Sequence, residues 1–433
     1  MKSKVLFRII PLVLLLYACA PGDLRLPQSP ALPFLERKSG LIAYLGTDGN
    51  LYVSDQAGGK LLALTKDGKL PETETDDFLI YQHPAWSSDG RYLAYAGLSR
   101  EADTASSELN ILDMVSNKTT QIYRSTTEIP YYLFWSPDNA NLSFLSTAAS
   151  GQTQILQNIS ANGERRIIDT GSPMYWSWAP DGRVMIVHAG DPGTGEPADK
   201  TAFLLLDGDV TEIGLDVKPA PFQSPGWSPD GKLILYAVVS AGNDYAIIMA
   251  EGDGSNPQEM ATFTGKAAFV WSPDSQKFAY IDSDETTDTG ALGNLQIVDV
   301  VTKEVHTEER NVIAFFWSPD SRSLAYFVPY LDSSSASSED QSADLLLELN
   351  ILDEESGESR KILTYKPTSQ FADLLPFFDQ YHQSMTIWSP DSNNLVVTFV
   401  DSEAASGVAV VAASGRLEPR FLAEGLLAVW SWR

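Results

Sequence analysis

The pentapeptide Trp227-Ser228-Pro229-Asp230-Gly231, followed by the apolar run Leu233-Ile234-Leu235-Tyr236, decides the fold because it recurs along the chain. Full or close copies of the motif begin at Trp86, Trp135, Trp178, Trp271, Trp317 and Trp388, and the chain ends with Trp430-Ser431-Trp432-Arg433. Successive tryptophans are 49, 43, 49, 44, 46, 71 and 42 residues apart. A period of this size is typical of a repeat architecture.

The Ser-Pro-Asp-Gly part of the motif predicts a tight turn. Proline presets φ at the second position, aspartate bonds the nearby backbone, and glycine tolerates the left-handed conformation at the last position. Three copies carry serine at that last position, namely Ser275, Ser321 and Ser392. Because serine fits a positive φ less well, we expect these three turns to be less favourable.

Each repeat contains four short strand-like runs, which predicts one four-stranded antiparallel sheet, or blade, per repeat. Eight second strands can be counted along the chain, so the sequence predicts an all-β, eight-bladed β-propeller. Seven blades is the alternative if one weak repeat is misread. Residues 41–44 have no motif before them and Ala428-Val429-Trp430 has no strand after it, so we expect the C-terminal strand to complete the N-terminal blade and close the ring.

The repeat resembles the TolB-like (WD40-like) propeller repeat. The likeness rests on the motif, the following Leu-Ala-Tyr run, and the stretch Glu-Leu-Asn-Ile-Leu-Asp at 108–113 and again at 348–353. Similar repeats occur in the propeller domains of prolyl-oligopeptidase relatives. The resemblance covers residues 41–433 and implies the propeller fold. The chain departs from TolB in having eight repeats rather than six and in lacking its N-terminal α/β domain.

The N-terminus has the form of a bacterial export signal. Residues 1–18 hold Lys2, Lys4 and Arg8 before an apolar run that is too short to span a bilayer. The run ends Leu16-Tyr17-Ala18-Cys19, which resembles a lipobox, and Cys19 is the only cysteine of the chain. We therefore expect a lipoprotein acylated at Cys19, with palmitate among its acyl chains and an extracytoplasmic, membrane-anchored location. Ordinary signal cleavage after Ala20 is the alternative.

The domain division follows from these features. Residues 1–18 are predicted to be the signal peptide, residues 19–38 a proline-rich tether, and residues 39–433 the propeller. Two long insertion loops are expected at 328–344 and 366–385. We expect the propeller to be monomeric.

The charge of the chain is strongly acidic: 57 Asp and Glu oppose 30 Lys and Arg, for a formal charge of −27. Nucleic acid is excluded as a partner because phosphate binding needs clustered basic residues. An acidic surface keeps an exported domain soluble and favours a cationic partner.

The long connections between repeats are expected to open on one face of the ring, where binding usually resides. They are acidic and aromatic, which suits a cationic or amphipathic protein or cell-envelope component. The residues predicted to form this binding face are Asp76, Asp77, Phe78, Tyr81, Asp284, Glu285, Asp288, Phe377, Phe378, Tyr381 and His382. Solvated loops without a binding role are the alternative.

No cofactor and no metal site is predicted. The segment Asp282-Ser283-Asp284-Glu285, continuing to Asp288, offers carboxylates to calcium, but it lacks the glycine and terminal glutamate of an EF-hand. Calcium is the weaker alternative. The four histidines are widely separated in sequence and do not predict zinc.

No enzyme is predicted, because G-x-S-x-G and HExxH are absent and the phosphate-loop-like stretch at 226–232 lacks its Ser or Thr. The sequence therefore predicts a lipid-anchored binding or scaffold propeller that acts through its long-loop face. The alternative is a propeller that binds carbohydrate or cleaves glycans or peptides, which would require paired carboxylates in the central funnel.

Overall fold

The computed structural model describes residue 25 and residues 38–59, 61–73, 76–147, 153–190, 199–221, 223–240, 244–283, 291–332 and 344–433. The predicted leader and tether lie almost wholly outside these residues. No helix in the described part of the chain is long and apolar enough to cross a membrane.

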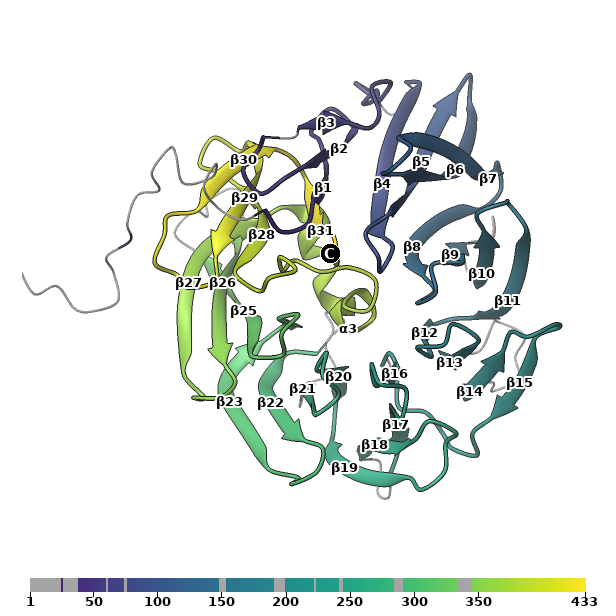
Figure 1. Cartoon of the computed structure of the whole chain (residues 1–433), viewed down its shortest axis with the longest axis vertical. Helices are drawn as coiled ribbons and strands as arrows, with labels where there is room; N and C mark the ends of the chain where they lie inside the picture. Colours follow the sequence, from purple (N-terminus) through teal and green to yellow (C-terminus); the bar gives the residue numbers. More distant parts are fainter. Residues whose placement is uncertain are drawn as a thin grey trace, which may run out of the picture.

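Antiparallel sheets stand side by side around a central axis (Figure 1). Among the described residues there are six four-stranded sheets and one seven-stranded sheet. The N-terminal sheet contains β3 (Leu62–Ala63), β2 (Leu51–Ser54), β1 (Ile42–Leu45) and β31 (Leu427–Trp430). The next contains β4 (Phe78–Trp86), β5 (Tyr92–Glu101), β6 (Thr104–Asp113) and β7 (Lys118–Ser125). The third contains β8 (Ile129–Trp135), β9 (Asn141–Thr147), β10 (Gln154–Ser160) and β11 (Arg165–Gly171).

The remaining sheets continue around the ring in chain order. The fourth contains β12 (Met174–Trp178), β13 (Val184–Ala189), β14 (Lys200–Leu205) and β15 (Thr211–Gly214). The fifth contains β16 (Gly226–Trp227), β17 (Leu233–Val239), β18 (Tyr245–Glu251) and β19 (Gln258–Phe263). The sixth contains β20 (Lys266–Trp271), β21 (Lys277–Ser283), β22 (Gly293–Asp299) and β23 (Val305–Val312). The seven-stranded sheet contains β24 (Ala314–Trp317), β25 (Ser323–Asp332), β26 (Asp344–Asp353), β27 (Ser359–Pro367), β28 (Asn394–Val400), β29 (Ser406–Ala412) and β30 (Arg420–Glu424).

The C-terminal strand completes the N-terminal sheet, as predicted. β31 pairs antiparallel with β1 from Ile42↔Trp430 to Leu45↔Leu427. This pairing joins the two ends of the repeat array and covers an edge of β1 that would otherwise be free.

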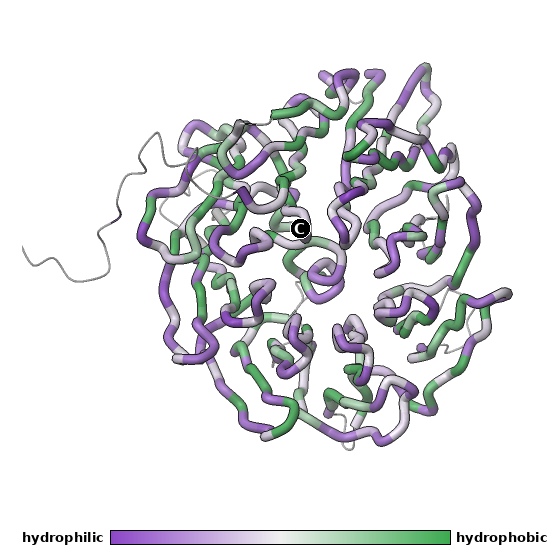
Figure 2. The backbone as a smooth tube through the Cα atoms, viewed as in Figure 1, coloured by the Kyte–Doolittle hydropathy of each residue, from purple (hydrophilic) through white to green (hydrophobic). Residues whose placement is uncertain are grey.

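The motif tryptophans hold neighbouring sheets together. The indole Nε1 of Trp135 donates to the carbonyl of Ala85 on the preceding sheet at 3.0 Å, and Trp271 does the same to Gly226 at 3.0 Å. Hydrophobic residues are therefore distributed through all the sheets, where they pack between neighbours, and are not gathered in one central core (Figure 2).

The motif turns adopt the expected positive φ at their last position, including 64° at Ser275, 62° at Ser321 and 60° at Ser392. The serines also have a role that the sequence did not indicate. The hydroxyl of Ser275 accepts the backbone N–H of Asp230 in the preceding repeat at 3.0 Å, and Ser321 accepts that of Asp274 at 3.0 Å. A hydrogen bond between repeats thus offsets the strain of the left-handed serine.

Residues 366–385, predicted as a long loop, lie largely in short helical turns at the axis. Figure 1 shows α3 near the centre of the ring. The segment contains α2 (Ser369–Ala372), η3 (Leu375–Phe377) and α3 (Phe378–Tyr381). We call residues 369–384 the axial plug, because they contact the innermost strands of several sheets.

Candidate functional site

Two inner strands next to one another carry the same irregularity. β4 has a β-bulge between Gln82 and Ala85, where His83 has a φ of 54°. β8 has one between Tyr131 and Leu133, where Tyr132 has a φ of 47°. A positive φ is costly for a bulky residue and persists only where the surrounding structure holds it. Bulges and such strained residues concentrate near functional sites, because they redirect side chains.

The axial plug holds the second bulge in place. Tyr132 is 3% exposed and donates its hydroxyl to the carbonyl of Gln380 at 2.7 Å. The ring of Tyr132 packs edge-on against Trp176 and Tyr381, with centroids 5.0 Å apart in each case. The plug and two sheets are therefore joined at one aromatic cluster.

A cavity of about 570 Å³ lies between these bulged strands and the plug. We call it the long-loop pocket, because Gly46, Gly49 and Leu70, which belong to connections at the strand ends opposite the motif turns, line it. Its polar and aromatic lining residues are Tyr81, Gln82, His83, Tyr131, Tyr132, Gln154, Tyr175, Gln370, Asp373, Phe377, Gln380 and Tyr381. Its volume falls in the range of small-molecule sites.

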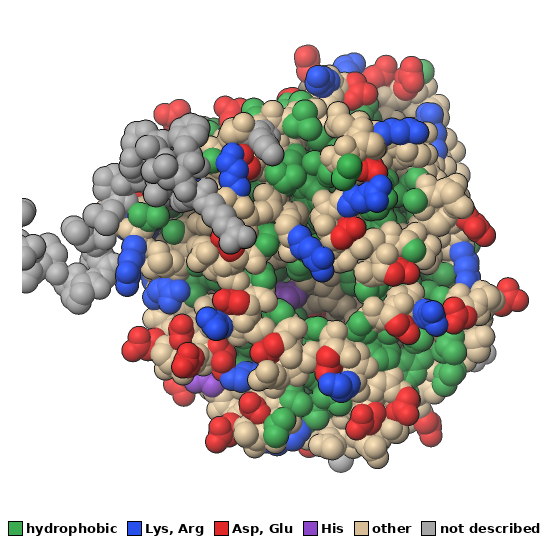
Figure 3. Space-filling model, viewed as in Figure 1, with side chains coloured by type: hydrophobic (Ala, Val, Ile, Leu, Met, Phe, Trp, Pro, Cys, Tyr) green, Lys and Arg blue, Asp and Glu red, His purple; other side chains and the backbone are tan. Residues whose placement is uncertain are grey.

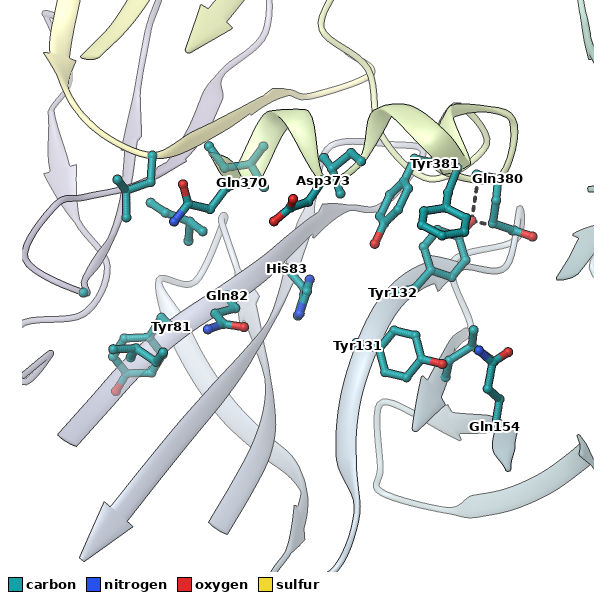
Figure 4. A pocket seen from close by; sticks show the side chains of 18 of the residues that line it. Tyr81, Gln82, His83, Tyr131, Tyr132, Gln154, Gln370, Asp373, Gln380 and Tyr381 are labelled. Atoms are coloured by element: carbon teal, nitrogen blue, oxygen red, sulfur yellow. Dashed lines mark hydrogen bonds between the residues drawn. The ribbon is translucent and has the colours of Figure 1, made fainter. Parts of the chain in front are cut away.

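Figure 4 shows how these side chains face one another. The strands contribute Gln82, His83 and Tyr131, and the plug contributes Asp373 and Gln370. All five side chains point toward the same space. Leucine side chains and Met174 form the rest of the pocket wall. The pocket is thus mainly apolar, with a few convergent polar groups, which is the usual composition of a ligand site.

The histidine and two of the tyrosines that line the pocket are uncharged at neutral pH, and Asp373 is the one carboxyl side chain among its described lining residues. Burial lowers the pKa of His83 to about 4, so its imidazole is neutral. Burial raises the pKa of Tyr131 to about 12 and raises that of Tyr175 further, so both phenols keep their protons. No Lys or Arg lines the pocket among the described residues. An anionic ligand would therefore find no counter-charge there.

Only part of the predicted binding face comes together here. Tyr81, Phe377 and Tyr381 all line the long-loop pocket, although 296 residues separate Tyr81 from Phe377 in the sequence. Phe377 is 44% exposed and is therefore accessible to a ligand.

Phe378 and His382 have different surroundings. Phe378 is 1% exposed and packs on Phe315, with ring centroids 4.8 Å apart, so it belongs to the core that fixes the plug. The His382 Nε2 accepts the backbone N–H of Trp317 at 3.1 Å on the other side of the plug. Neither residue lines the long-loop pocket.

The acidic members of the predicted face organise a loop. Asp76 accepts the backbone N–H of Thr73 at 2.8 Å, and the carbonyl of Asp76 accepts the Arg100 guanidinium. Asp77 accepts the N–H of Ala102 at 3.0 Å, and Arg100 also lies over the ring of Phe78. These contacts tie the connection before β4 to the hairpin of β5 and β6.

Asp284, Glu285 and Asp288 lie outside the described residues, as does most of the segment considered for calcium. Within the described residues there is no group of three or more His, Cys, Asp or Glu side chains that could hold a metal ion.

Sequence reasoning missed His83, Tyr131 and Tyr132. The signal that could have found them is the length of the first strands: Phe78–Trp86 and Ile129–Trp135 hold more polar and aromatic residues before the tryptophan than Ala314–Trp317 does. Extra residues in an inner strand can form a bulge, which the repeat pattern alone does not reveal.

Comparison with known protein families and with curated proteins finds no match. Solved structures do match. A prolyl endopeptidase structure aligns at 11% identity and a TM-score of 0.54, over 79% of this chain and 49% of that one. The β-propeller domain of a trilobed protease from Pyrococcus furiosus aligns at 16% identity and a TM-score of 0.49, over 81% and 97%. TolB from Acinetobacter baumannii aligns at 14% identity and 0.36, over 79% and 82%.

The fold is a β-propeller. At these identities the comparisons show the fold alone. They nevertheless correct the expectation that the chain is no enzyme: the similar structures include a prolyl endopeptidase, so the missing motifs do not exclude catalysis on this scaffold.

Proposed function

We propose that this chain is an extracytoplasmic binding propeller, anchored to the membrane by acylated Cys19, that captures an amphipathic component of the cell envelope in its long-loop pocket. The observation that carries the proposal is the placement of two strained bulges, at His83 and Tyr132, side by side under the axial plug. The fold maintains an unfavourable backbone at both positions, and both residues line the same cavity.

The chemistry of the pocket favours a partly apolar group that carries no negative charge. Leucine, methionine and aromatic side chains would take the apolar part, and the amides of Gln82, Gln154 and Gln370 would bond polar edges. The formal charge of −27 would favour a partner whose remaining surface is cationic. We infer that the ligand is a segment of an envelope protein, with Phe377 at its point of entry.

We also propose that the propeller has eight blades. In the seven-stranded sheet, β24 ends at Trp317, β25–β27 follow the motif at Trp317 and β28–β30 follow the motif at Trp388, so we assign two repeats to this sheet. β27 and β28 are joined only at Lys366↔Val400 and Pro367↔Phe399. A bridge between Trp388 and Leu395 supplies an inner strand position for the last repeat.

Photo-crosslinking in intact cells tests the function. A photoreactive benzoylphenylalanine in place of Phe377 should label one partner protein, and labelling should weaken at high salt. The matched control is the same substitution at Phe421, which is 60% exposed but lies on outer strand β30, away from the pocket. Tyr131→Leu in the Phe377-labelled protein should reduce the product at least fivefold. Equal products from both positions would contradict the proposal.

A neutral saccharide is the second candidate. It is favoured by the tyrosine rings, which can pack against the apolar faces of sugars, together with the amides of Gln82, Gln154 and Gln370 in one pocket. Mass analysis of the crosslinked product separates the two candidates, because a glycan adduct carries no tryptic peptide of a second protein.

A further inference from the structure

A second cavity lies at the opposite end of the axis. Its volume is about 390 Å³, and its walls are formed by the repeated motif, with a Trp or Pro side chain from each of several sheets. Asp379, His382 and Gln383 of the axial plug form its floor. We call it the motif-face cavity, and the plug separates it from the long-loop pocket. Figure 3 shows a hollow near the centre of one face of the molecule.

The walls of the motif-face cavity are unusually aromatic. Six tryptophans, two phenylalanines and four prolines line it, and no Lys or Arg does among the described residues. The cation–π contacts between described residues involve the rings of Tyr92, Phe78 and Tyr123, none of which lines this cavity. These tryptophan rings therefore have no cationic side chain of the described chain over them.

One carboxyl group reaches this aromatic space. Asp379 is 5% exposed, its Oδ2 accepts the N–H of Ser224 at 2.9 Å, and its Oδ1 accepts the N–H of Gln380 at 2.9 Å. None of the ion pairs of the described residues includes Asp379. Two backbone donors orient the carboxyl group, and no basic side chain neutralises it.

Among the described residues, one other titratable side chain lines the cavity, and it is neutral. His382 Nε2 accepts the N–H of Trp317, which requires an unprotonated nitrogen, and burial lowers the pKa of His382 to about 4. Asp379 is therefore the single charged side chain among the described residues that line the cavity. An aromatic enclosure with one carboxylate and no competing cation is complementary to an organic ammonium ion.

We propose that the motif-face cavity binds a small organic cation, an alkylammonium ion whose charge lies near Asp379 and whose apolar groups pack against the tryptophans. This site is separate from the long-loop pocket, so it stands whether or not the proposed function holds. The cavity volume suits a small molecule.

Calorimetry and tryptophan fluorescence with a matched pair of probes test the assignment. Choline and 3,3-dimethylbutan-1-ol have nearly the same shape, and only choline is charged. We expect choline to bind the full-length protein at least tenfold more tightly than the neutral alcohol and to change the tryptophan emission. Equal affinity for the two probes, or no binding of choline, would overturn the proposal.

Variants locate the site. Asp379→Asn keeps the shape of the side chain and should weaken choline binding at least tenfold. Asp373→Asn, which alters a carboxyl group of the long-loop pocket, is the matched control and should leave choline binding unchanged. If Asp379→Asn does not fold, Trp227→Phe, on a half-buried wall residue, should still weaken choline binding several-fold. Unchanged binding in the folded variants contradicts the proposal.

Discussion

The amide of Gln380 donates to the phenol oxygen of Tyr132 at 2.7 Å across 248 residues of sequence. The same side chain accepts the N–H of Trp176 at 3.0 Å and donates to the carbonyl of Trp176 at 3.0 Å. Gln380 thus bonds the inner strands of two sheets from the centre of the ring. Gln380 therefore fixes the position of the plug along the axis of the ring. It also fixes the position of the bulge that shapes the long-loop pocket.

Replacing Gln380 with leucine should destabilise the protein substantially. The change leaves buried polar groups of Tyr132 and Trp176 without partners, and each buried unsatisfied group costs about 1–3 kcal/mol. We expect a loss of about 2–4 kcal/mol in the free energy of unfolding, measured by urea denaturation. Gln370→Leu, in the same plug but half-buried, should change it by less than about 1 kcal/mol. Equal effects would show that the contacts of Gln380 do not fix the plug.

Replacing Phe378 should cost much more stability than replacing its neighbour Phe377. Phe378→Ala removes a fully buried ring from its contact with Phe315 and should cost about 3–5 kcal/mol of stability. Phe377→Ala removes a ring that is 44% exposed and should cost about 1 kcal/mol or less. Thermal unfolding of the two variants gives the comparison. A stable Phe378→Ala variant would mean that the plug does not pack as described.

Asp379 should make stability depend on pH. Burial raises the pKa of this carboxyl to about 6 in the folded state, against an ordinary value of 3.8. The folded state therefore holds the proton more tightly, so the contribution of Asp379 to stability is complete below about pH 4 and declines as the pH rises through about 6. Between pH 5 and pH 7.5 the stability of the protein relative to Asp379→Asn should fall by about 1.5 kcal/mol.

Urea denaturation at several pH values measures this difference. The lowest pH should stay above the isoelectric point of about 4.4, where the protein is least soluble. A difference between the two proteins that does not vary with pH would show that the pKa of Asp379 is close to that of an exposed aspartate.

Replacing a motif serine with glycine should change the free energy of unfolding only a little. Ser275→Gly relieves a φ of 64° but removes the hydroxyl that accepts the N–H of Asp230. The two effects oppose one another, so the net change in unfolding free energy should be within about 1 kcal/mol. Ser275→Ala loses the hydrogen bond and keeps the strain, and should be less stable than Ser275→Gly by about 1 kcal/mol. A variant Ser275→Ala as stable as the parent would show that the hydrogen bond between repeats contributes nothing.

Cys19→Ser tests the anchor. If Cys19 carries the acyl chains, the substituted protein should move from the membrane fraction to the soluble fraction, because no other cysteine can replace it. Incorporation of labelled palmitate should be lost together with membrane attachment. Membrane attachment that persists after loss of the label would assign the anchoring to another part of the chain.

Most of the architecture could be predicted from the repeated motif. The tight turns, the interlocking tryptophans and the pairing of β31 with β1 all follow from local patterns that recur at a fixed period. The candidate site could be predicted only in part. Tyr81, Phe377 and Tyr381, which the sequence assigned to one binding face, line the same pocket, and their role in binding stays a prediction. Phe378 was expected at the surface and is buried.

The sequence by itself determined that the chain folds into repeated antiparallel sheets whose first and last strands pair. It could do so because a turn and a buried tryptophan are local features, repeated seven times over. Only the tertiary structure decided that residues 369–384 fill the axis and divide it into two cavities. That outcome depends on contacts between Gln380, Tyr132 and Trp176. These residues are far apart in the sequence and come together only in the folded ring, so no local sequence pattern predicts their contacts.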